Sequence, residues 1–158
     1  MKTTLNKIRA HSPCKPGWEK LLESLGKTKA DDEPITIIQI LNSNGLDDAI
    51  WCLRGVDGRE KELRLLVVAY ARRVQHLMID ARSIAALDVA ERFANGVATE
   101  LELAAARDAA RDPAGDAAWA AAEAAAGDAA GDAAWAAAEA AEKTWQEAEL
   151  RRVCEACA

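Results

Sequence analysis

The chain has 158 residues and a formal net charge of −6, and 51% of its residues are hydrophobic, many of them alanine. This length allows one domain with a substantial core, or one compact domain with a helical appendage, but hardly two independent domains. The N-terminus lacks an apolar signal core, and no apolar run approaches the roughly 20 residues that span a membrane. We therefore expect a soluble, cytosolic protein without membrane contact.

The charge is unevenly distributed along the chain. Residues 1–100 carry 15 Lys and Arg against 14 Asp and Glu, whereas residues 101–158 carry 5 against 12. The acidity therefore belongs to the C-terminal part. Four cysteines are too few for a dense disulfide framework, so we expect reduced thiols.

The first predicted helix follows two prolines near the N-terminus. Pro13 and Pro16 exclude an earlier helix interior, and Pro16 suits the first turn of a new helix. Three leucines then form an apolar stripe, and Gly26 is placed to end the helix.

An isoleucine-rich segment predicts the second helix. Asp32 is expected to be its N-cap, with Pro34 in the first turn, and Asn44-Gly45 is a natural end. The β-branched residues at positions 35–38 leave a strand as the alternative. The carboxylates at 31–33 and 47–48 are expected to cap helices, which explains them without catalysis.

Further helices are predicted from apolar spacing and capping signals. One begins at Leu46 and carries residues 50–53 into the core. The clearest amphipathic pattern starts at Arg59, with apolar residues at spacings of three and four. Those residues are Leu63, Leu66, Val67, Tyr70, Val74 and Leu77. Asp80 suits the N-cap of the next helix, which should end at Asn95-Gly96.

The alanine-rich region should begin with a capping box formed by Thr99 and Glu102. No sustained period-two alternation is present, so the fold class is predicted to be all-α. We expect a compact multi-helix domain with an alanine-rich helical hairpin at its C-terminal end. The predicted division is a helical core at 1–98 and an acidic repeat region at 99–158 packed on it, with burial supplied by Leu, Ile, Val and Trp of the first hundred residues.

The alanine-rich region contains a repeated module. Between residues 104 and 141, 23 of 38 residues are alanine, and GDAAWAAAEAA occurs twice. Alanine is the best helix former, so helices are expected here. Acidic residues and tryptophans recur at steps of three and four, which places them on stripes of a helix surface. The stripe residues are Asp108, Asp112, Asp116, Trp119, Glu123, Asp128, Asp132, Trp135 and Glu139.

The period of this repeat bears on whether the region is one helix. A shift of 16 residues turns a straight helix by about 160° beyond full turns, so two matching stripes would face opposite sides. We therefore favour consecutive antiparallel helices with turns at Gly115, Gly127 or Gly131. One continuous helix of about 40 residues is the alternative.

The stripes allow two interpretations. The tryptophans can cover a neighbouring helix, and the acids can keep an alanine-rich helix in solution. Alternatively, tryptophan and carboxylate together form a surface that binds a partner and competes for a basic, nucleic-acid-binding groove.

Two pairs of possible metal ligands lie near the chain ends. His11 and Cys14 are three residues apart, as are Cys154 and Cys157, and the four together would suit a zinc site if the ends meet. We nevertheless expect no metal and no cofactor, because cysteines on helix faces commonly fill cores. No catalytic triad, phosphate loop or nucleic-acid motif is present, so we expect neither an enzyme nor direct contact with nucleic acid.

Four segments carry a resemblance to a known group of proteins. The segments are CKPGWEKLLESLGKTKADDEP, SNGLDDAIWCLR, RRVQHLM and SIAALDVAERFANGVATELELAAARDAARD. They resemble small bacterial and prophage proteins described as immunity proteins, which have a Leu/Trp-rich helical front half and a tail of Ala-Asp-Trp repeats. The resemblance covers most of residues 12–141 and implies stoichiometric binding to a toxin.

The residues and the resemblance together favour a protein that acts by binding another protein. The leading hypothesis is a phage or prophage inhibitor of the anti-CRISPR type, which occludes a host-defence nuclease with its acidic helical face. An immunity protein that neutralises a toxin is the alternative, and a zinc protein or enzyme built on the terminal Cys and His pairs is a third. Homodimerisation is left open.

Overall fold

The computed structural model describes residues 1–73, 75–78, 80–110 and 129–157, with backbone only at 77 and 129–138. It is 74% helical and contains one small two-stranded sheet, which confirms a mostly α-helical fold. None of the described helices combines the length and apolarity that crossing a lipid bilayer requires. The described chain forms two compact units, residues 1–59 with 143–158 (unit 1) and residues 60–142 (unit 2). These boundaries differ from the predicted division at residue 98.

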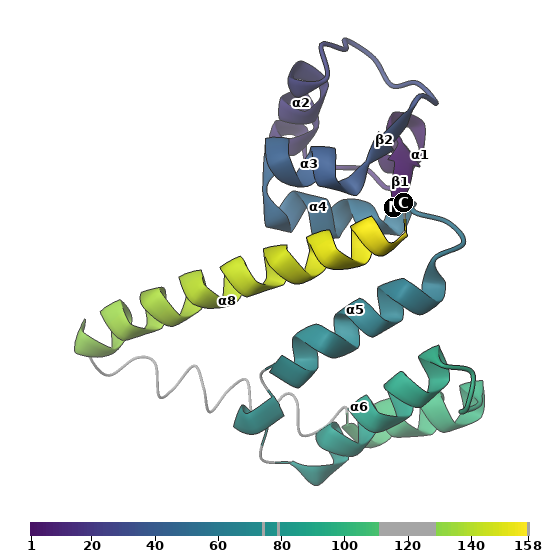
Figure 1. Ribbon diagram of the computed structural model, residues 1–158, viewed down its shortest axis with the longest axis vertical. Coiled ribbons are helices and arrows are strands. Elements are labelled where there is room, and N and C mark those ends of the chain that lie inside the picture. The colour runs from purple at the N-terminus through teal and green to yellow at the C-terminus, as the bar shows by residue number, and fades with distance from the viewer. Residues whose placement is uncertain (74, 79, 111–128, 158) are drawn as a thin grey trace. The chain divides into compact units, whose positions relative to one another are not determined.

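Unit 1 contains two short strands, separated in the chain by two helices, and each strand leads directly into a helix (Figure 1). Strands β1 (Lys2–Thr4) and β2 (Pro34–Thr36) pair antiparallel, with Thr3 opposite Ile35. The hydroxyl of Thr4 accepts a hydrogen bond from the Lys7 amide at 3.2 Å and so caps helix α1 (Leu5–Ala10). Strand β1 was not predicted. The expectation that Pro13 and Pro16 exclude an earlier helix is wrong, because α1 ends at Ala10, before either proline.

The second strand corrects the predicted start of the isoleucine-rich helix. Residues 34–36 are extended, and helix α3 (Ile37–Asn44) begins only after Thr36. Thr36 and Gln39 form a complete capping box, in which the Gln39 amide donates to the Thr36 hydroxyl at 3.1 Å. The predicted N-cap at Asp32 is therefore wrong, because a Thr followed by Gln three residues later satisfies the backbone at both positions.

The remaining helices of unit 1 follow the predicted turns. Helix α2 (Lys15–Ser24) ends at Gly26 as predicted, with φ +64° and the amide of Lys27 donating to the Leu22 carbonyl at 2.9 Å. Helix α4 (Leu46–Cys52) continues into a 3₁₀ turn, η1 (Leu53–Gly55). It buries Ala49 and Cys52, whereas the other residues of the predicted core segment 50–53 stay partly exposed.

The core of unit 1 includes the C-terminal end of the chain. Helix α8 (Ala129–Ala156) contributes Leu150, which is completely buried, and Cys154, which is 1% exposed. The Met1 amino group donates to the Cys154 carbonyl at 3.1 Å, and the two chain ends lie side by side in Figure 1. Burial is thus not confined to the first hundred residues, and Trp18, Trp51 and Trp145 are all only partly buried.

Unit 2 is built on helices α5 (Glu60–Arg73) and α6 (Ala81–Ala94), with a 3₁₀ turn, η2 (Gln75–Leu77), between them. The predicted caps are confirmed: Asp80 accepts from the Arg82 amide at 2.7 Å, and α6 ends at Asn95. The predicted α5 stripe is only partly right, since Leu66 is buried but Val67 is 64% exposed.

A third helical segment of unit 2 covers residues 100–110. It starts with the predicted capping box, in which the Thr99 amide donates to the Glu102 carboxylate at 2.7 Å and the Glu102 amide donates to the Thr99 hydroxyl at 3.2 Å. The predicted turn at Gly131 is wrong, because Gly131 lies inside α8. One glycine costs a helix about 1 kcal/mol, which the surrounding alanines readily offset. Gly115 and Gly127 lie outside the described residues.

Candidate functional site

The stripe residues are only partly covered by the structure. Asp108 and Glu139 are described and exposed. Asp132 and Trp135 belong to α8 together with Glu139, so their spacing of three and four falls within one continuous helix. The other stripe residues lie outside the described part of the chain; they are Asp112, Asp116, Trp119, Glu123 and Asp128.

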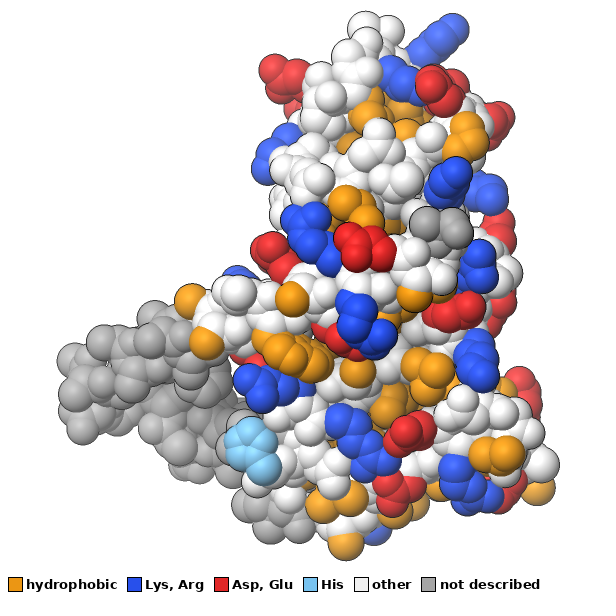
Figure 2. All heavy atoms as spheres, viewed as in Figure 1, with side chains coloured by type: hydrophobic (Ala, Val, Ile, Leu, Met, Phe, Trp, Pro, Cys, Tyr) orange, Lys and Arg blue, Asp and Glu red, His pale blue; other side chains and the backbone are white. Residues whose placement is uncertain are grey.

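Large exposed apolar side chains of the described residues lie in unit 2. Among the described side chains, the large hydrophobic ones that are exposed are Val67 (64%), Val97 (64%) and Leu101 (81%). In Figure 2, apolar side chains appear among charged ones over α5 and α6. Of these three side chains, Val67 also lines an apolar groove.

An apolar groove lies within the same unit. It has a volume of about 420 Å³ and is lined by side chains from α5, α6 and the helical segment 100–110. Its principal apolar walls are Leu63, Val67, Phe93 and Leu103. The guanidinium of Arg64 lies over the Phe93 ring, 4.8 Å from its centroid, which fixes the ring at the groove wall.

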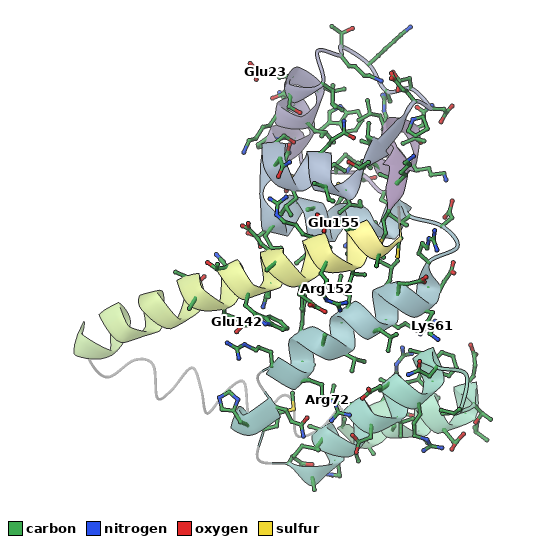
Figure 3. All side chains as sticks on the ribbon, in the orientation of Figure 1. Glu23, Lys61, Arg72, Glu142, Arg152 and Glu155 are labelled. Atoms are coloured by element: carbon green, nitrogen blue, oxygen red, sulfur yellow. The ribbon has the colours of Figure 1, made fainter. Side chains whose placement is uncertain are left out.

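Polar contacts hold the three helical segments of the groove together. Arg72 of α5 reaches α6, where it pairs with Asp88 at 2.5 Å and with Glu91 at 2.9 Å (Figure 3). These two hydrogen bonds raise the pKa of Arg72, so the bridge stays charged at every physiological pH. Arg92 of α6 pairs with Glu102 of the next segment at 3.3 Å.

The charge of the molecule is concentrated in unit 2. Residues 60–142 contain 8 basic and 15 acidic residues, a net charge of −7, whereas unit 1 contains 12 basic and 11 acidic residues, a net charge of +1. Residues 60–110, which include the groove, contain 7 basic and 8 acidic residues, so most of the negative charge of unit 2 belongs to residues 111–142.

The terminal Cys and His residues do not form a metal site. All four are described, yet no group of three or more His, Cys, Asp or Glu in the described ranges is placed to hold a metal ion. Cys14 lines a pocket of about 90 Å³ beside Trp18, whereas Cys154 and Cys157 line a different one. The zinc alternative is therefore wrong. The two chain ends meet, but His11 and Cys14 do not join Cys154 and Cys157 in a metal-binding group.

Two of the four thiols, those of Cys52 and Cys154, are buried. Burial, followed by the nearby charge of Asp48, raises the pKa of Cys52 to about 12. Burial likewise raises the pKa of Cys154. Because the thiolate is the reactive form, neither thiol has the environment of a nucleophile.

The carboxylates expected to cap helices have other partners. Asp31 pairs with Lys27 rather than with a helix N-terminus, and its pKa is lowered chiefly by that hydrogen bond. The N-cap of α4 is Gly45 with no side-chain cap, and Asp48 instead accepts a hydrogen bond from the side-chain amide (Nδ2) of Asn44 at 2.8 Å. The capping explanation of these acids is therefore wrong.

Sequence reasoning did not identify the groove. Leu63 and Val67 were expected on one apolar stripe of a helix, but both line the groove. The signal lies in the spacing of α5, where consecutive Leu66, Val67 and Val68 cannot all face one side of a helix.

Comparison with known proteins adds no relative: no protein-family model, no curated protein and no solved structure matches this chain.

Proposed function

We propose that this chain is a non-enzymatic inhibitor that binds another protein stoichiometrically through unit 2. The observation that carries the proposal is the coincidence, in one unit, of the apolar groove, the exposed side chains of Val67 and Leu101, and a net charge of −7. Apolar anchors in a groove supply most of the binding energy of an interface. The negative charge elsewhere in the unit directs the encounter and selects the partner.

The proposed target is a nuclease with a basic, nucleic-acid-binding surface. An acidic partner is attracted to such a surface and, once bound, blocks access of nucleic acid. A host-defence nuclease or CRISPR effector in a phage-infected bacterial cell is the leading candidate. A bacterial toxin is the alternative, which the resemblance of the helical segments to immunity proteins favours, and both use the same mechanism of occlusion.

The apolar part of the proposal is tested by a matched pair of substitutions. Val67 and Val97 are both 64% exposed, but only Val67 lines the groove. Once the partner has been isolated from the host by affinity capture, its binding is measured by calorimetry. We expect Val67→Asp to weaken binding by at least about tenfold, since a charge in an interface core is left without a partner, and Val97→Asp to leave it unchanged. Equal binding by the two variants would remove the groove from the interface.

The electrostatic part is tested by charge reversal. The acids of one set, Asp116, Glu123, Asp132 and Glu139, are replaced by lysine. The control set has the same number of reversals on exposed acids of unit 1, namely Glu23, Asp32, Asp47 and Glu155. Only the first set should abolish inhibition and remove the salt dependence of association. If the two sets inhibit equally well, the acids only maintain solubility.

The two classes of target are separated by genome context and by activity. A toxin gene immediately upstream would favour immunity, whereas neighbouring phage structural or regulatory genes would favour inhibition of host defence. Rescue of cells from the neighbouring toxin, compared with rescue of phage from a host nuclease system, distinguishes the two directly.

A further inference from the structure

Unit 1 contains a basic hollow that the proposed inhibitor function does not use. The hollow has a volume of about 520 Å³. Six of its lining residues carry the chemistry: Arg9, Ser12, Lys15, Trp18, Thr28 and Lys29. Three cations thus converge on one hollow, and no carboxylate is among its lining residues.

Three separate segments bring these residues together. Arg9 lies in the last turn of α1, and Lys15 and Trp18 lie in the first turns of α2. Between them the chain reverses at Ser12, which has φ +56° and is the one described residue other than glycine with positive φ. The amide of Ser12 donates to the Arg9 carbonyl at 3.0 Å, which fixes the reversal. A serine in this region is strained, and such strain is typically retained at functional positions.

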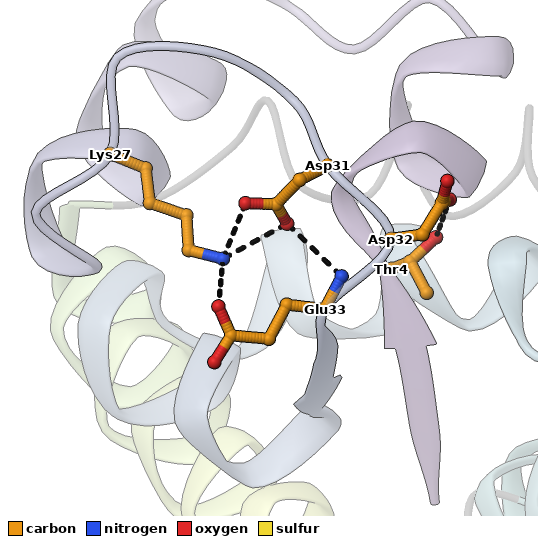
Figure 4. Close-up of polar contacts among 5 residues, drawn as sticks. All are labelled: Thr4, Lys27, Asp31, Asp32 and Glu33. Atoms are coloured by element: carbon orange, nitrogen blue, oxygen red, sulfur yellow. Dashed lines mark hydrogen bonds and ion pairs between the residues drawn. The ribbon is translucent and has the colours of Figure 1, made fainter.

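The third segment is a loop fixed by Lys27 (Figure 4). The Lys27 ammonium pairs with the carboxylates of Asp31 at 2.7 Å and Glu33 at 2.6 Å. The amide of Asn6 donates to the Asp31 carbonyl at 3.0 Å and thereby attaches the loop to α1. Because Lys27 already binds these two acids, the loop presents Thr28 and Lys29 to the hollow while its carboxylates are engaged.

The cations of the hollow lack strong partners. In the part of the chain that the structure describes, neither Arg9 nor Lys29 forms an ion pair. Lys15 approaches Glu19 at 3.8 Å, but both side chains are largely exposed, and such pairs contribute little. Three like charges around one hollow repel one another, and an anion with several oxygens relieves that repulsion.

The lining chemistry identifies the anion. Arg, Lys and hydroxyl side chains are the usual donors to phosphate oxygens. An indole ring beside them supplies a surface on which a nucleobase stacks. The geometry points to a nucleotide site, in which phosphate lies among Arg9, Lys15 and Lys29 and the base stacks on Trp18.

The ligand is a free nucleotide or one unit of a single strand, since both present the same phosphate and base. The net charge of unit 1 is +1, so the unit does not repel such an anion. Sequence reasoning expected no contact with nucleic acid because no motif accompanies the basic residues; here the fold, not the sequence, groups them.

The experiment measures fluorescence anisotropy of a labelled ten-residue oligothymidylate with the full chain in 50 mM salt. We expect binding that weakens with salt, with a slope of about −2 in a double-logarithmic plot. The strand presents successive phosphates, and each of the three cations Arg9, Lys15 and Lys29 that neutralises one of them contributes about −0.7. The variant Arg9→Gln/Lys29→Gln should bind at least about tenfold more weakly and lower the slope to about −0.7. The matched control Lys2→Gln/Lys20→Gln removes two exposed cations elsewhere in unit 1 and should change affinity by less than about twofold.

Two further ligands test whether the base contributes to binding and whether the ligand is a free nucleotide or a single strand. An abasic ten-residue strand should bind about fivefold more weakly or worse, because stacking on Trp18 is lost; equal binding would overturn the base-stacking part. A labelled adenine nucleotide that binds with the same dependence on Arg9 and Lys29 supports a free-nucleotide site, and binding of the strand alone supports a single-strand site.

Three outcomes overturn the proposal. They are the absence of binding by either ligand in 50 mM salt, equal losses in the hollow variant and the control, and preference for a phosphorylated peptide over both nucleotide ligands. All substituted side chains are exposed, so thermal unfolding should show an intact fold in each variant. The charge-reversed variants of unit 2 should bind nucleotide like the parent chain, which makes this test independent of the proposed inhibition.

Discussion

The Thr3 hydroxyl donates a hydrogen bond to the Gly55 carbonyl at 2.5 Å, and its oxygen would lie only 2.8 Å from a Cβ at position 55. Thr3 is 2% exposed and joins β1 to the 3₁₀ turn after α4. The contact requires both the hydroxyl and the missing side chain of glycine.

Replacing Thr3 with valine keeps the shape but removes the donor. The buried carbonyl of Gly55 then loses its partner, so the free energy of unfolding should fall by about 1–3 kcal/mol in denaturant titration. Thr3→Ser retains the hydroxyl and should lose less. Gly55→Ala should also lower the free energy of unfolding. The loss should be smaller in a protein that also carries Thr3→Ala, because the contact at 2.8 Å is then absent. Strict additivity of the two substitutions would contradict this coupling.

Leu150 tests the contribution of the C-terminal helix to unit 1. It is fully buried, so Leu150→Ala should lower the free energy of unfolding by about 2–5 kcal/mol. Leu101 is 81% exposed, and Leu101→Ala should change it by less than about 0.5 kcal/mol. Chemical denaturation of both variants measures these changes. If Leu150→Ala leaves the free energy of unfolding unchanged, α8 does not complete this core.

The Lys27 cluster predicts a dependence of stability on pH. The hydrogen bond from Lys27 lowers the pKa of Asp31 below its ordinary value of 3.8, so its contribution to stability is present above pH 3.8 and is lost as the pH falls through the folded-state value. The pKa of Lys27 is raised above 10.5 by Asp31 and then Glu33, so its contribution is lost at alkaline pH. In Asp31→Asn, the free energy of unfolding should depend less on pH in the acid range. In Lys27→Met, it should depend less on pH in both the acid and the alkaline range. An unchanged acid limb in Asp31→Asn would refute the assignment.

Gly131 distinguishes a continuous helix from a turn. Within α8 it has no structural need for glycine, so Gly131→Ala should raise the thermal midpoint, with a gain of up to about 1 kcal/mol. Gly26 has φ +64°, and Gly26→Ala should have the opposite sign, costing about 1–2 kcal/mol. Circular dichroism melts measure both. A lower thermal midpoint in Gly131→Ala would instead indicate a turn at that position.

The features that sequence reasoning predicted correctly are local ones. The capping box of Thr99 and Glu102, the N-cap at Asp80 and the helix end at Gly26 each depend on residues within one or two turns. The equivalent box of Thr36 and Gln39 is also visible in the sequence, but the Asp32-Pro34 signal competed with it.

The features that it missed depend on distant parts of the chain. Strands β1 and β2 have three residues each, too short for a period-two pattern, and their register joins residues 30 to 34 positions apart. The burial of Leu150 and Cys154 has the same origin, since no local pattern shows which helix covers them. Of the candidate sites, the acidic stripes were visible from spacing. The groove and the basic hollow were not, because each collects side chains from three segments.

The division of unit 1 between residues 1–59 and 143–158 also sets an order of events during synthesis. When the first segment leaves the ribosome, the residues that complete its core have not yet been made, and at typical elongation rates they follow on the order of ten seconds later. All of unit 2 is synthesised in that interval. The leucine and isoleucine side chains of the N-terminal segment are therefore completely covered only after unit 2 has been synthesised.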